Sequence, residues 1–378
     1  MTLGTPPVVV LSTADFDSAV WTNKQHLAVG LARHADVTYV ESFGLRAPTV
    51  SGADLRRVAR RAAGRRGGGQ RTAPSRPDRL RVVSPRVVPF HGAAAARRLN
   101  AQLVRRLDLP GLDEGVLWTF SPMTYGLERR ARHVVYHSVD LLHTQPRVPA
   151  AALLDAERHL LRVADRVVAS STGVAAHLRA QGRDDVLLWE NVADVELFAG
   201  AAVPRRPRAV FAGNLTPTKV DVGLLLDVVD RGLELVLAGP HEIDGAGRDG
   251  RVGVLLSHPR VTTVGNLPPD RLAEVVAGCT VGLVPYALND YTAGVFPLKV
   301  YEYLAAGLAV VSTPLASLRE TTAPGLSLVE ASRFGAAAVA ASGVPDPVVL
   351  ADRRAAAASH SWTARVADAV ALVDGFGA

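Results

Sequence analysis

Short apolar segments alternate with segments of helical periodicity along most of this chain of 378 residues. Val8–Ser12 and Ala309–Ser312 are typical of strands that are buried on both faces of a parallel sheet. The alternation runs twice, once before and once after Ala201–Arg208, where two prolines stand among arginines. Such a series predicts parallel α/β architecture. We therefore predict two doubly wound, Rossmann-like parallel-sheet domains facing a central cleft, where ligands meet the carboxyl ends of the strands.

The individual elements can be placed from the same pattern. The first series predicts strands at Val8–Ser12, Val37–Glu41, Leu80–Ser84, Gly115–Thr119, Val134–His137, Arg166–Ser170 and Val186–Trp189, and helices at Asn23–Arg33, Ala94–Leu107 and Pro149–Ala164, with Thr172 as the N-cap of a fourth. The second predicts strands at Ala209–Ala212, Leu233–Ala238, Val261–Val264, Val281–Pro285 and Ala309–Ser312, and helices at Val222–Asp230, Arg271–Ala277, Leu298–Ala306 and Arg333–Ala341.

Composition excludes several classes of protein. The single cysteine, Cys279, excludes an intramolecular disulfide framework and a cysteine-cluster zinc site, and suits a reducing cytoplasm. No apolar run is long enough to span a bilayer, and no basic n-region precedes the first apolar stretch, so we expect a cytoplasmic location. The histidines show no HExxH or other zinc spacing, so no metal site is expected. The chain also has no GxGxxG dinucleotide fingerprint after the first strand and no nucleophile elbow.

The positive charge is concentrated in one segment. The chain carries a net +6, whereas residues 46–81 hold eleven arginines and two acids, a net +9, which leaves the rest at −3. Because the body is slightly acidic and aromatics make up only 5% of the chain, we do not expect nucleic-acid binding. Within the segment, Leu55, Val58, Ala59 and Ala62 would share one side of a short helix. Such a helix could lie on the anionic inner surface of a membrane; the alternative is a solvated loop.

The most informative motif is PLKVYEYLAAGLAVVST, residues 297–313. Pro297 suits the first turn of a helix and Gly307 its end. A glycine-containing loop, Asp290–Gly294, precedes the motif, and a helix N-terminus behind such a loop suits a phosphate. Lys299 in the first turn opposes the helix dipole unless an anion is bound there, and Glu302 on the same face suits the hydroxyls of a ribose. The alternative is that Lys299 and Glu302 form a surface i,i+3 pair.

This motif closely resembles the nucleotide-sugar-binding signature of GT-B glycosyltransferases of group 1, especially the retaining family 4 type and its cell-surface-polysaccharide and teichuronic-acid-type relatives. Phe211–Asn214 followed by Lys219, Leu235–Pro240 and Val264–Pro268 resemble further parts of that donor domain. The resemblance implies that Glu302 accepts the ribose hydroxyls and that Lys299 and Lys219, with the amides of residues 292–295, hold the diphosphate. The implied donor-binding residues are Asn214, Lys219, Gly265, Asn266, Leu267, Thr292, Ala293, Gly294, Val295, Pro297, Leu298, Lys299 and Glu302.

Two positions depart from the family pattern. Many members carry a second glutamate, contacting the donor sugar, where this chain has Gly294. Asp290 or Asn289 could substitute, or backbone amides could hold the sugar alone. An arginine common near the start of the second domain is also absent, and Asn214 and Thr218 stand nearby.

The acceptor-side candidates lie in the first half of the chain. His137 and Asp140 end a predicted strand at the cleft, and Lys24 opens the first long helix. A carboxylate there can orient or deprotonate an acceptor hydroxyl. The alternatives are an N-capping aspartate, a packed histidine and a solvated helix start.

With the resemblance, the predicted acceptor-binding domain spans residues 1–200, including the Arg-rich insertion at about 46–79. The nucleotide-sugar domain spans 201–358, and the helix entered at Ser361-Trp362 crosses back to the first domain over 359–378. The resemblance implies a hexosyltransferase, which moves a sugar from a nucleoside diphosphate to a hydroxyl acceptor with retention of configuration. It implies no cofactor and no metal. Lys299 and Glu302 would act at the donor. Asp140 is the base if the enzyme inverts. The alternatives are a non-catalytic GT-B partner protein and an epimerase or phosphorylase of the same fold.

Overall fold

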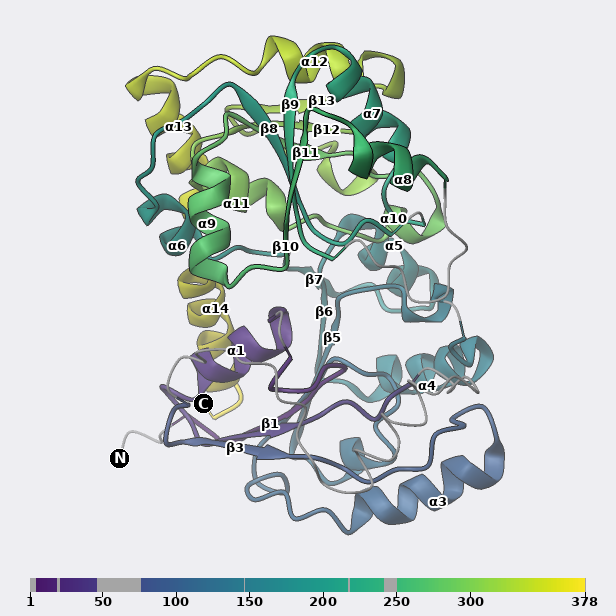
Figure 1. Ribbon diagram of the computed structural model, residues 1–378. Coiled ribbons are helices and arrows are strands. Elements are labelled where there is room, and N and C mark those ends of the chain that lie inside the picture. Colours follow the sequence, from purple (N-terminus) through teal and green to yellow (C-terminus); the bar gives the residue numbers. More distant parts are fainter. Residues whose placement is uncertain are drawn as a thin grey trace. The chain divides into compact units, whose positions relative to one another are not determined.

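A computed structural model describes residues 5–18, 21–45, 76–145, 147–216, 218–240 and 250–377 (Figure 1). It divides into two compact units: unit 1 comprises Met1–Glu190 and Arg365–Ala378, and unit 2 comprises Asn191–Ala364. The first division falls at residue 190 where the sequence suggested 200, and the second falls inside the last helix, α14 (Trp362–Asp374). Most of the Arg-rich insertion, residues 46–75, lies outside the described residues.

Unit 1 is built on a seven-stranded sheet with the order β3-β2-β1-β4-β5-β6-β7, in which every neighbouring pair is parallel. Its strands are β1 (Val8–Leu11), β2 (Val37–Val40), β3 (Leu80–Val83), β4 (Val116–Thr119), β5 (His133–Ser138), β6 (Arg166–Ala169) and β7 (Val186–Leu188). Its helices are α1 (Asn23–Leu31), α3 (Ala94–Arg105), α4 (Ala150–Val163), α5 (Thr172–Ala180) and the short turns η1 (Leu127–Arg129) and η2 (Leu142–Thr144).

The end of α14 belongs to the core of unit 1. Ala369 and Val373 are fully buried in one apolar cluster with Leu27 and Leu31 of α1. A Cβ on Gly30 would lie 2.1 Å from Cγ2 of Val366, so the glycine allows α14 to pack closely against α1.

Unit 2 repeats the same topology with six parallel strands, in the order β10-β9-β8-β11-β12-β13. The strands are β8 (Arg208–Ala212), β9 (Glu234–Ala238), β10 (Val261–Gly265), β11 (Val281–Val284), β12 (Ala309–Ser312) and β13 (Leu326–Leu328). The helices are α6 (Val195–Gly200), α7 (Val222–Asp230), α8 (Gly250–Ser257), α9 (Pro269–Ala277), α10 (Asp290–Ala293), α11 (Lys299–Ala305), α12 (Phe334–Ala340) and α13 (Pro347–Ala358), with the short turns η3 (Ala316–Leu318) and η4 (Ala331–Arg333).

The predicted fold class of two doubly wound parallel-sheet domains is confirmed, and each predicted strand forms within about two residues of its expected bounds. One local prediction was wrong: Ser171, rather than Thr172, is the N-cap of α5, because its side chain accepts a hydrogen bond from the amide of Val174 at 3.1 Å. In the described part of the chain, no helix is long and apolar enough to cross a membrane.

The strand order determines where each unit can bind a ligand. In both sheets the order reverses beside the first strand, between β1 and β4 and between β8 and β11. Open parallel sheets bind ligands outside the carboxyl ends of the strands at such a reversal. The loops after β8 and β11 are therefore the expected ligand-binding loops of unit 2, and those after β1 and β4 are their counterparts in unit 1.

Candidate functional site

Three glycines line the carboxyl edge of the unit 2 sheet. Gly213, Gly239 and Gly265 end or follow β8, β9 and β10 with φ values of +152°, +132° and +67°. The amide of Gly213 donates to Ala238 O at 2.7 Å, and the amide of Gly239 donates to Gly265 O at 2.7 Å. A Cβ on Gly239 would lie 2.4 Å from Gly213 O, so these loops can be this close only without side chains.

The loop after β8 folds back onto the chain after β11. Val220 forms an antiparallel bridge with Tyr286, and the amide of Ala287 donates to Lys219 O at 3.0 Å. This pairing places the ammonium nitrogen of Lys219 4.8 Å from the centroid of the Tyr286 ring. Because Tyr286 is buried, its ring holds a fixed position in this part of the site.

Lys299 reaches the same ring from the first residue of α11. Its Nζ lies 5.4 Å from the Tyr286 centroid and 4.6 Å from that of Phe211, and it donates a hydrogen bond to Ala212 O. One helical turn later, the hydroxyl of Tyr303 accepts a hydrogen bond from the amide of Ala212 at 2.8 Å. Lys299 and Tyr303, four residues apart on α11, therefore bind the carbonyl oxygen and the amide of Ala212, the last residue of β8. They place the cation at the carboxyl end of that strand.

Glu302 lies on α11 in an environment that disfavours its charge. Burial raises its pKa from 4.5 to about 7; the charge of Lys299 opposes the shift and that of Asp194 adds to it. The carboxyl group can therefore change its protonation state near neutral pH. Lys299 and Glu302 thus interact electrostatically in a partly buried setting, whereas the alternative drawn from the sequence was a surface pair.

Helix α11 begins at Lys299 and ends at Ala305, one residue inside the predicted range at each end, and Gly307 stops it as predicted. The amides of Gly307 and Leu308 donate to Leu304 O and Tyr303 O at 2.8 and 2.9 Å, a Schellman motif that uses the left-handed conformation of Gly307 (φ +85°). Pro297 lies before the helix, and its carbonyl oxygen accepts from the amide of Val300 at 3.0 Å.

Four backbone amides in the segment before α11 donate hydrogen bonds within that segment. Those of Thr292, Ala293, Gly294 and Val295 donate to the Asn289 side chain, Asn289 O, Tyr291 O and Thr292 O, respectively. The Thr292 side chain is also occupied, in a capping box with Asn289. In this structure, the four amides assigned to the diphosphate by resemblance thus stabilise α10 and the turn after it. An anion at α11 would meet the amides of Leu298 and Lys299, which have no intrahelical acceptor.

The remaining donor candidates differ in exposure. Asn214, Asn266 and Ala293 are exposed, Leu267 and Leu298 are half-buried, and Gly294, Val295 and Pro297 are buried. Asn289, a candidate substitute for the missing glutamate, donates to Thr218 O at 2.9 Å as well as capping α10. Asp290 is exposed in the first turn of α10.

The three acceptor-side candidates come together in unit 1. Lys24 is buried in the first turn of α1 with its Nζ 5.7 Å from the Phe120 centroid; burial lowers its pKa and the charge of Asp140 opposes that shift. His137 is buried on β5, with its ring centroid 4.8 Å from that of Phe120. Burial holds the pKa of His137 well below its usual range, and Arg365 and Lys24 lower it further. Neither ring nitrogen of His137 has a hydrogen-bond partner among the described residues.

Comparison with known proteins relates this geometry to a family. Residues 206–343, all within unit 2, match the model of the family described as glycosyl transferases group 1. Over these residues the chain is similar to the group 1 glycosyl transferases. This confirms the resemblance drawn from the motif at residues 297–313.

Two bacterial proteins are among the curated relatives of this chain. A Bacillus subtilis (strain 168) protein named for teichuronic acid biosynthesis, TuaH, is 28% identical over 183 residues, covering 45% of each chain. A GDP-mannose-dependent alpha-mannosyltransferase of Mycobacterium tuberculosis (strain CDC 1551 / Oshkosh) is 29% identical over 262 residues, covering 66% of this chain and 58% of that one. The chain thus matches about half the length of these curated relatives.

A solved structure matches this chain over most of its length. Anabaena HepE, in complex with UDP and glucose, covers 97% of this chain and 99% of its own, with a TM-score of 0.63 and 14% identity. At that identity the likeness shows the fold alone, which is the GT-B fold with its two Rossmann-like domains.

Some residues of the site were not predicted. The ring of Tyr286 contacts both lysines. Gly239 allows the close approach of the loop after β8, and the Tyr303 hydroxyl accepts a hydrogen bond from the amide at the end of β8. Their roles depend on pairings between distant segments. The capping box of Asn289 and Thr292 was detectable, because the two residues stand three apart in the sequence.

Proposed function

We propose that this chain is a glycosyltransferase that moves a sugar from a nucleoside diphosphate sugar to a hydroxyl acceptor. The observation that carries the proposal is the convergence of Lys219 and Lys299 on Tyr286, at the strand-order reversal of the unit 2 sheet. Two cations beside glycine backbone suit the two phosphates of a diphosphate, which backbone amides and ammonium groups bind well. The family match over residues 206–343 supports the same assignment.

In this proposal the lysines stabilise the leaving group. When the C1–O bond to the diphosphate breaks, negative charge develops on the departing phosphate, and fixed positive charges there lower the barrier. Lys299 is held by Ala212 O and the Phe211 ring, so its position is established before the reaction. We assign this role to the chain's own cations, and the reaction then requires no metal.

Glu302 would bind the ribose of the donor. As a carboxylate it accepts hydrogen bonds from two neighbouring hydroxyls, and a carboxylate close to the phosphates favours a neutral partner. Binding of the diol favours the ionised form and so lowers a pKa that burial has raised to about 7.

For stereochemistry we favour retention. The acceptor hydroxyl attacks C1 from the side that the diphosphate leaves, the new C1–O bond forms as the old one breaks, and the hydroxyl proton passes to the departing phosphate oxygen. No protein nucleophile is then needed, and Asp140 and Lys24 of unit 1 serve to contact the acceptor. If the product is inverted, Asp140 accepts that proton instead.

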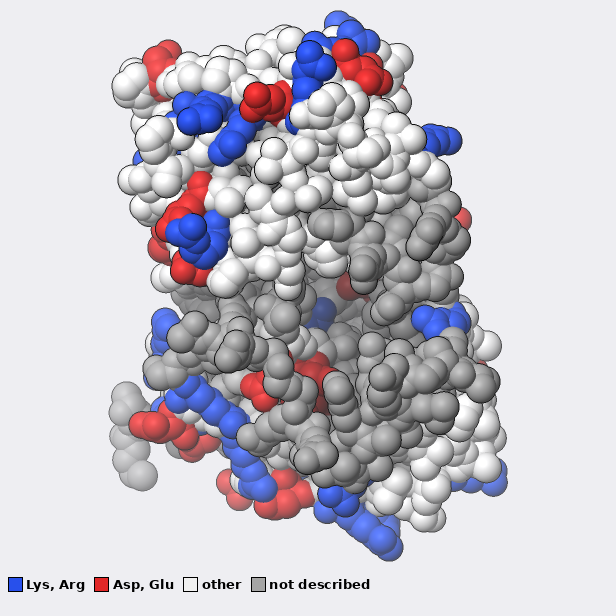
Figure 2. Space-filling view, in the orientation of Figure 1, with Lys and Arg blue, Asp and Glu red and all other residues white. Residues whose placement is uncertain are grey.

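We also assign the Arg-rich segment, residues 46–81, to an anionic membrane surface. Two of the three described arginines at its end form ion pairs within unit 1, Arg79 with Asp36 and Arg81 with Asp108, both at 2.8 Å, and Arg76 donates from Nε to Leu80 O at 3.1 Å. Basic and acidic side chains likewise stand side by side on the face drawn in Figure 2. The charge for a membrane therefore comes from residues 46–75, which carry eight arginines and one acid. Deletion of residues 52–77 should abolish binding to vesicles containing anionic lipid and leave transfer to a soluble acceptor intact.

The proposed activity is tested with a panel of donors. The relatives' names contain UDP and GDP-mannose, so purified protein is given radiolabelled UDP- and GDP-sugars with and without hydroxyl acceptors. Acceptor-dependent release of the nucleotide supports transfer, and the anomeric configuration of the product decides between retention and inversion. Nucleotide binding by calorimetry without turnover of any donor would instead indicate a non-catalytic protein of this fold. Conversion of the donor without an acceptor would indicate an epimerase.

A further inference from the structure

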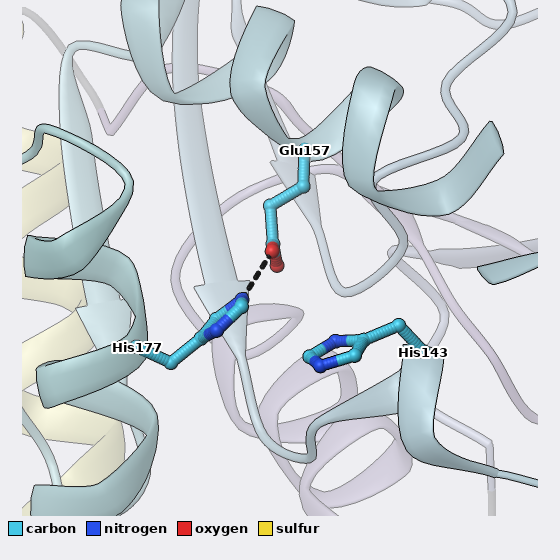
Figure 3. A group of neighbouring side chains, drawn as sticks. All are labelled: His143, Glu157 and His177. Carbon is cyan, nitrogen blue, oxygen red and sulfur yellow. Dashed lines mark hydrogen bonds and ion pairs between the residues drawn. The ribbon is translucent and has the colours of Figure 1, made fainter. Parts of the chain in front are cut away.

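Three side chains outside the proposed donor site converge in unit 1. His143 lies in η2, Glu157 in α4 and His177 in α5, and Figure 3 shows both imidazoles and the carboxylate directed toward one shared space. One potential ligand atom from each residue lies within 4.8 Å of the other two. The proposed transfer reaction uses none of these groups.

The carboxylate of this cluster is held from both sides. Glu157 is buried, its Oε1 accepts a hydrogen bond from the hydroxyl of Tyr136 at 2.6 Å, and its Oε2 lies 2.6 Å from Nε2 of His177. Metal-binding carboxylates are commonly oriented in this way by an outer hydrogen bond.

The second imidazole distinguishes the cluster from a simple Glu–His pair. The rings of His143 and His177 are stacked, with centroids 4.7 Å apart and planes at 25°. His143 forms no hydrogen bond with the other described residues, so its nitrogens are available for a further ligand.

We propose that His143, Glu157 and His177 bind a divalent transition metal ion of the zinc type. Two imidazole nitrogens and one carboxylate oxygen are a known three-ligand set for Zn²⁺, with a fourth position left to water. Ligand atoms around a tetrahedral zinc ion lie about 3.4 Å apart, given metal–ligand distances of about 2.0–2.2 Å. The cluster reaches this spacing if His143 moves inward and the Glu157–His177 pair opens slightly to admit the ion.

The position of the ligands indicates a structural role for the ion. His143 stands three residues after Asp140, in the segment that leaves the carboxyl end of β5, whereas Glu157 and His177 lie on two separate helices. A bound ion would therefore fasten the segment after β5 to α4 and α5. This role is distinct from the chemistry at the donor phosphates, which we assigned to lysines of unit 2.

The test uses the full chain with its affinity tag removed and its metals stripped by a chelator. Zn²⁺ is titrated in competition with a chromophoric chelator, and the wild type should bind one ion per chain at this site. His143→Ala and His177→Ala should each weaken zinc binding by at least about tenfold. His159→Ala is the matched control, because His159 lies on α4 but is directed to Glu128, with its Nε2 3.3 Å from Oε1, and zinc affinity should not change.

Thermal unfolding without zinc shows that each variant is folded. If His177→Ala does not fold, the His143→Ala variant gives the answer, because the His143 side chain forms no hydrogen bond with the residues that the structure describes. Zinc should also raise the melting temperature of the wild type and of His159→Ala, but not that of His143→Ala. Absence of stoichiometric zinc binding, or equal affinity in the wild type and His143→Ala, would overturn the proposal.

Discussion

Lys219 and Lys299 lie against the same aromatic ring, with their ammonium nitrogens 4.8 and 5.4 Å from the centroid of Tyr286. The chain contains three lysines in all, and eighty positions separate these two in the sequence. A favourable contact with the ring compensates for only part of the repulsion between two like charges. A bound diphosphate would remove that repulsion, and this relationship is therefore the centre of the proposed donor site.

Removing either lysine should slow transfer. Lys299→Ala and Lys219→Ala should each lower turnover at least about tenfold, or about 1.4 kcal/mol in the barrier, because charge on the leaving diphosphate loses a fixed counter-charge. The rates are measured with whichever donor proves active. Arg260→Ala removes an exposed positive charge from the same unit and should leave the rate unchanged. Normal turnover in both lysine variants would refute the site assignment.

Glu302→Ala should also lower turnover at least about tenfold, because the ribose hydroxyls lose the group that accepts their hydrogen bonds. The conservative variant Glu302→Gln keeps the volume and one acceptor oxygen, and should therefore retain more activity than Glu302→Ala. Michaelis constants for the donor should rise in both. Unchanged kinetics in Glu302→Ala would argue against contact with the donor.

The raised pKa of Glu302 should make the stability of the protein depend on pH. Below pH 4.5 the carboxyl is protonated in the folded and unfolded chains; between pH 4.5 and about 7 only the unfolded chain ionises, so stability falls as pH rises. Above pH 7 the loss of stability is complete, and we expect it to lower the free energy of unfolding by up to about 3 kcal/mol. Denaturant unfolding should therefore show Glu302→Gln gaining stability relative to the wild type between pH 5 and 8. The exposed Glu234→Gln should show no such trend, and a difference for Glu302→Gln that is constant over this range would contradict the shift.

Gly213 should be needed for the position of Lys299. A Cβ there would lie 2.6 Å from Lys299 Nζ, so Gly213→Ala should displace the cation as well as strain a backbone with φ +152°. Gly232→Ala is the matched control, because Gly232 has φ +95° and open space around its Cβ position. Both variants should lose stability, but only Gly213→Ala should also lose nucleotide affinity in calorimetry. Equal affinity in the two would show that the lysine can move without consequence.

Asp140 should support the charge of Lys24. Burial lowers the pKa of Lys24 and the charge of Asp140 opposes the shift, so Asp140→Asn should lower that pKa further. With ¹³C-labelled lysine, the three lysines give three NMR signals whose titration can be followed directly. The exposed Asp184→Asn should leave the Lys24 signal unchanged. An unchanged Lys24 titration in Asp140→Asn would mean that the two side chains do not interact.

The sequence predicted those parts of the molecule that depend on local patterns. Valine-rich strands such as β1 and β12 were placed within a residue because strands buried on both faces form continuous apolar runs. Tyr286 was not predicted, because its role depends on a bridge to Val220, more than sixty residues away. The cluster of His143, Glu157 and His177 matched no zinc pattern because its members come from three separate elements, and only the fold brings them together.

The most direct test of the donor site uses the same lysine labelling. UDP, GDP and dTDP are added in turn to the ¹³C-lysine-labelled protein, with the three signals assigned by single lysine-to-arginine variants. We predict that one nucleotide shifts the signals of Lys219 and Lys299 together, with the same apparent dissociation constant. If no nucleotide moves either signal, or if only Lys24 responds, Lys219 and Lys299 do not form the diphosphate site.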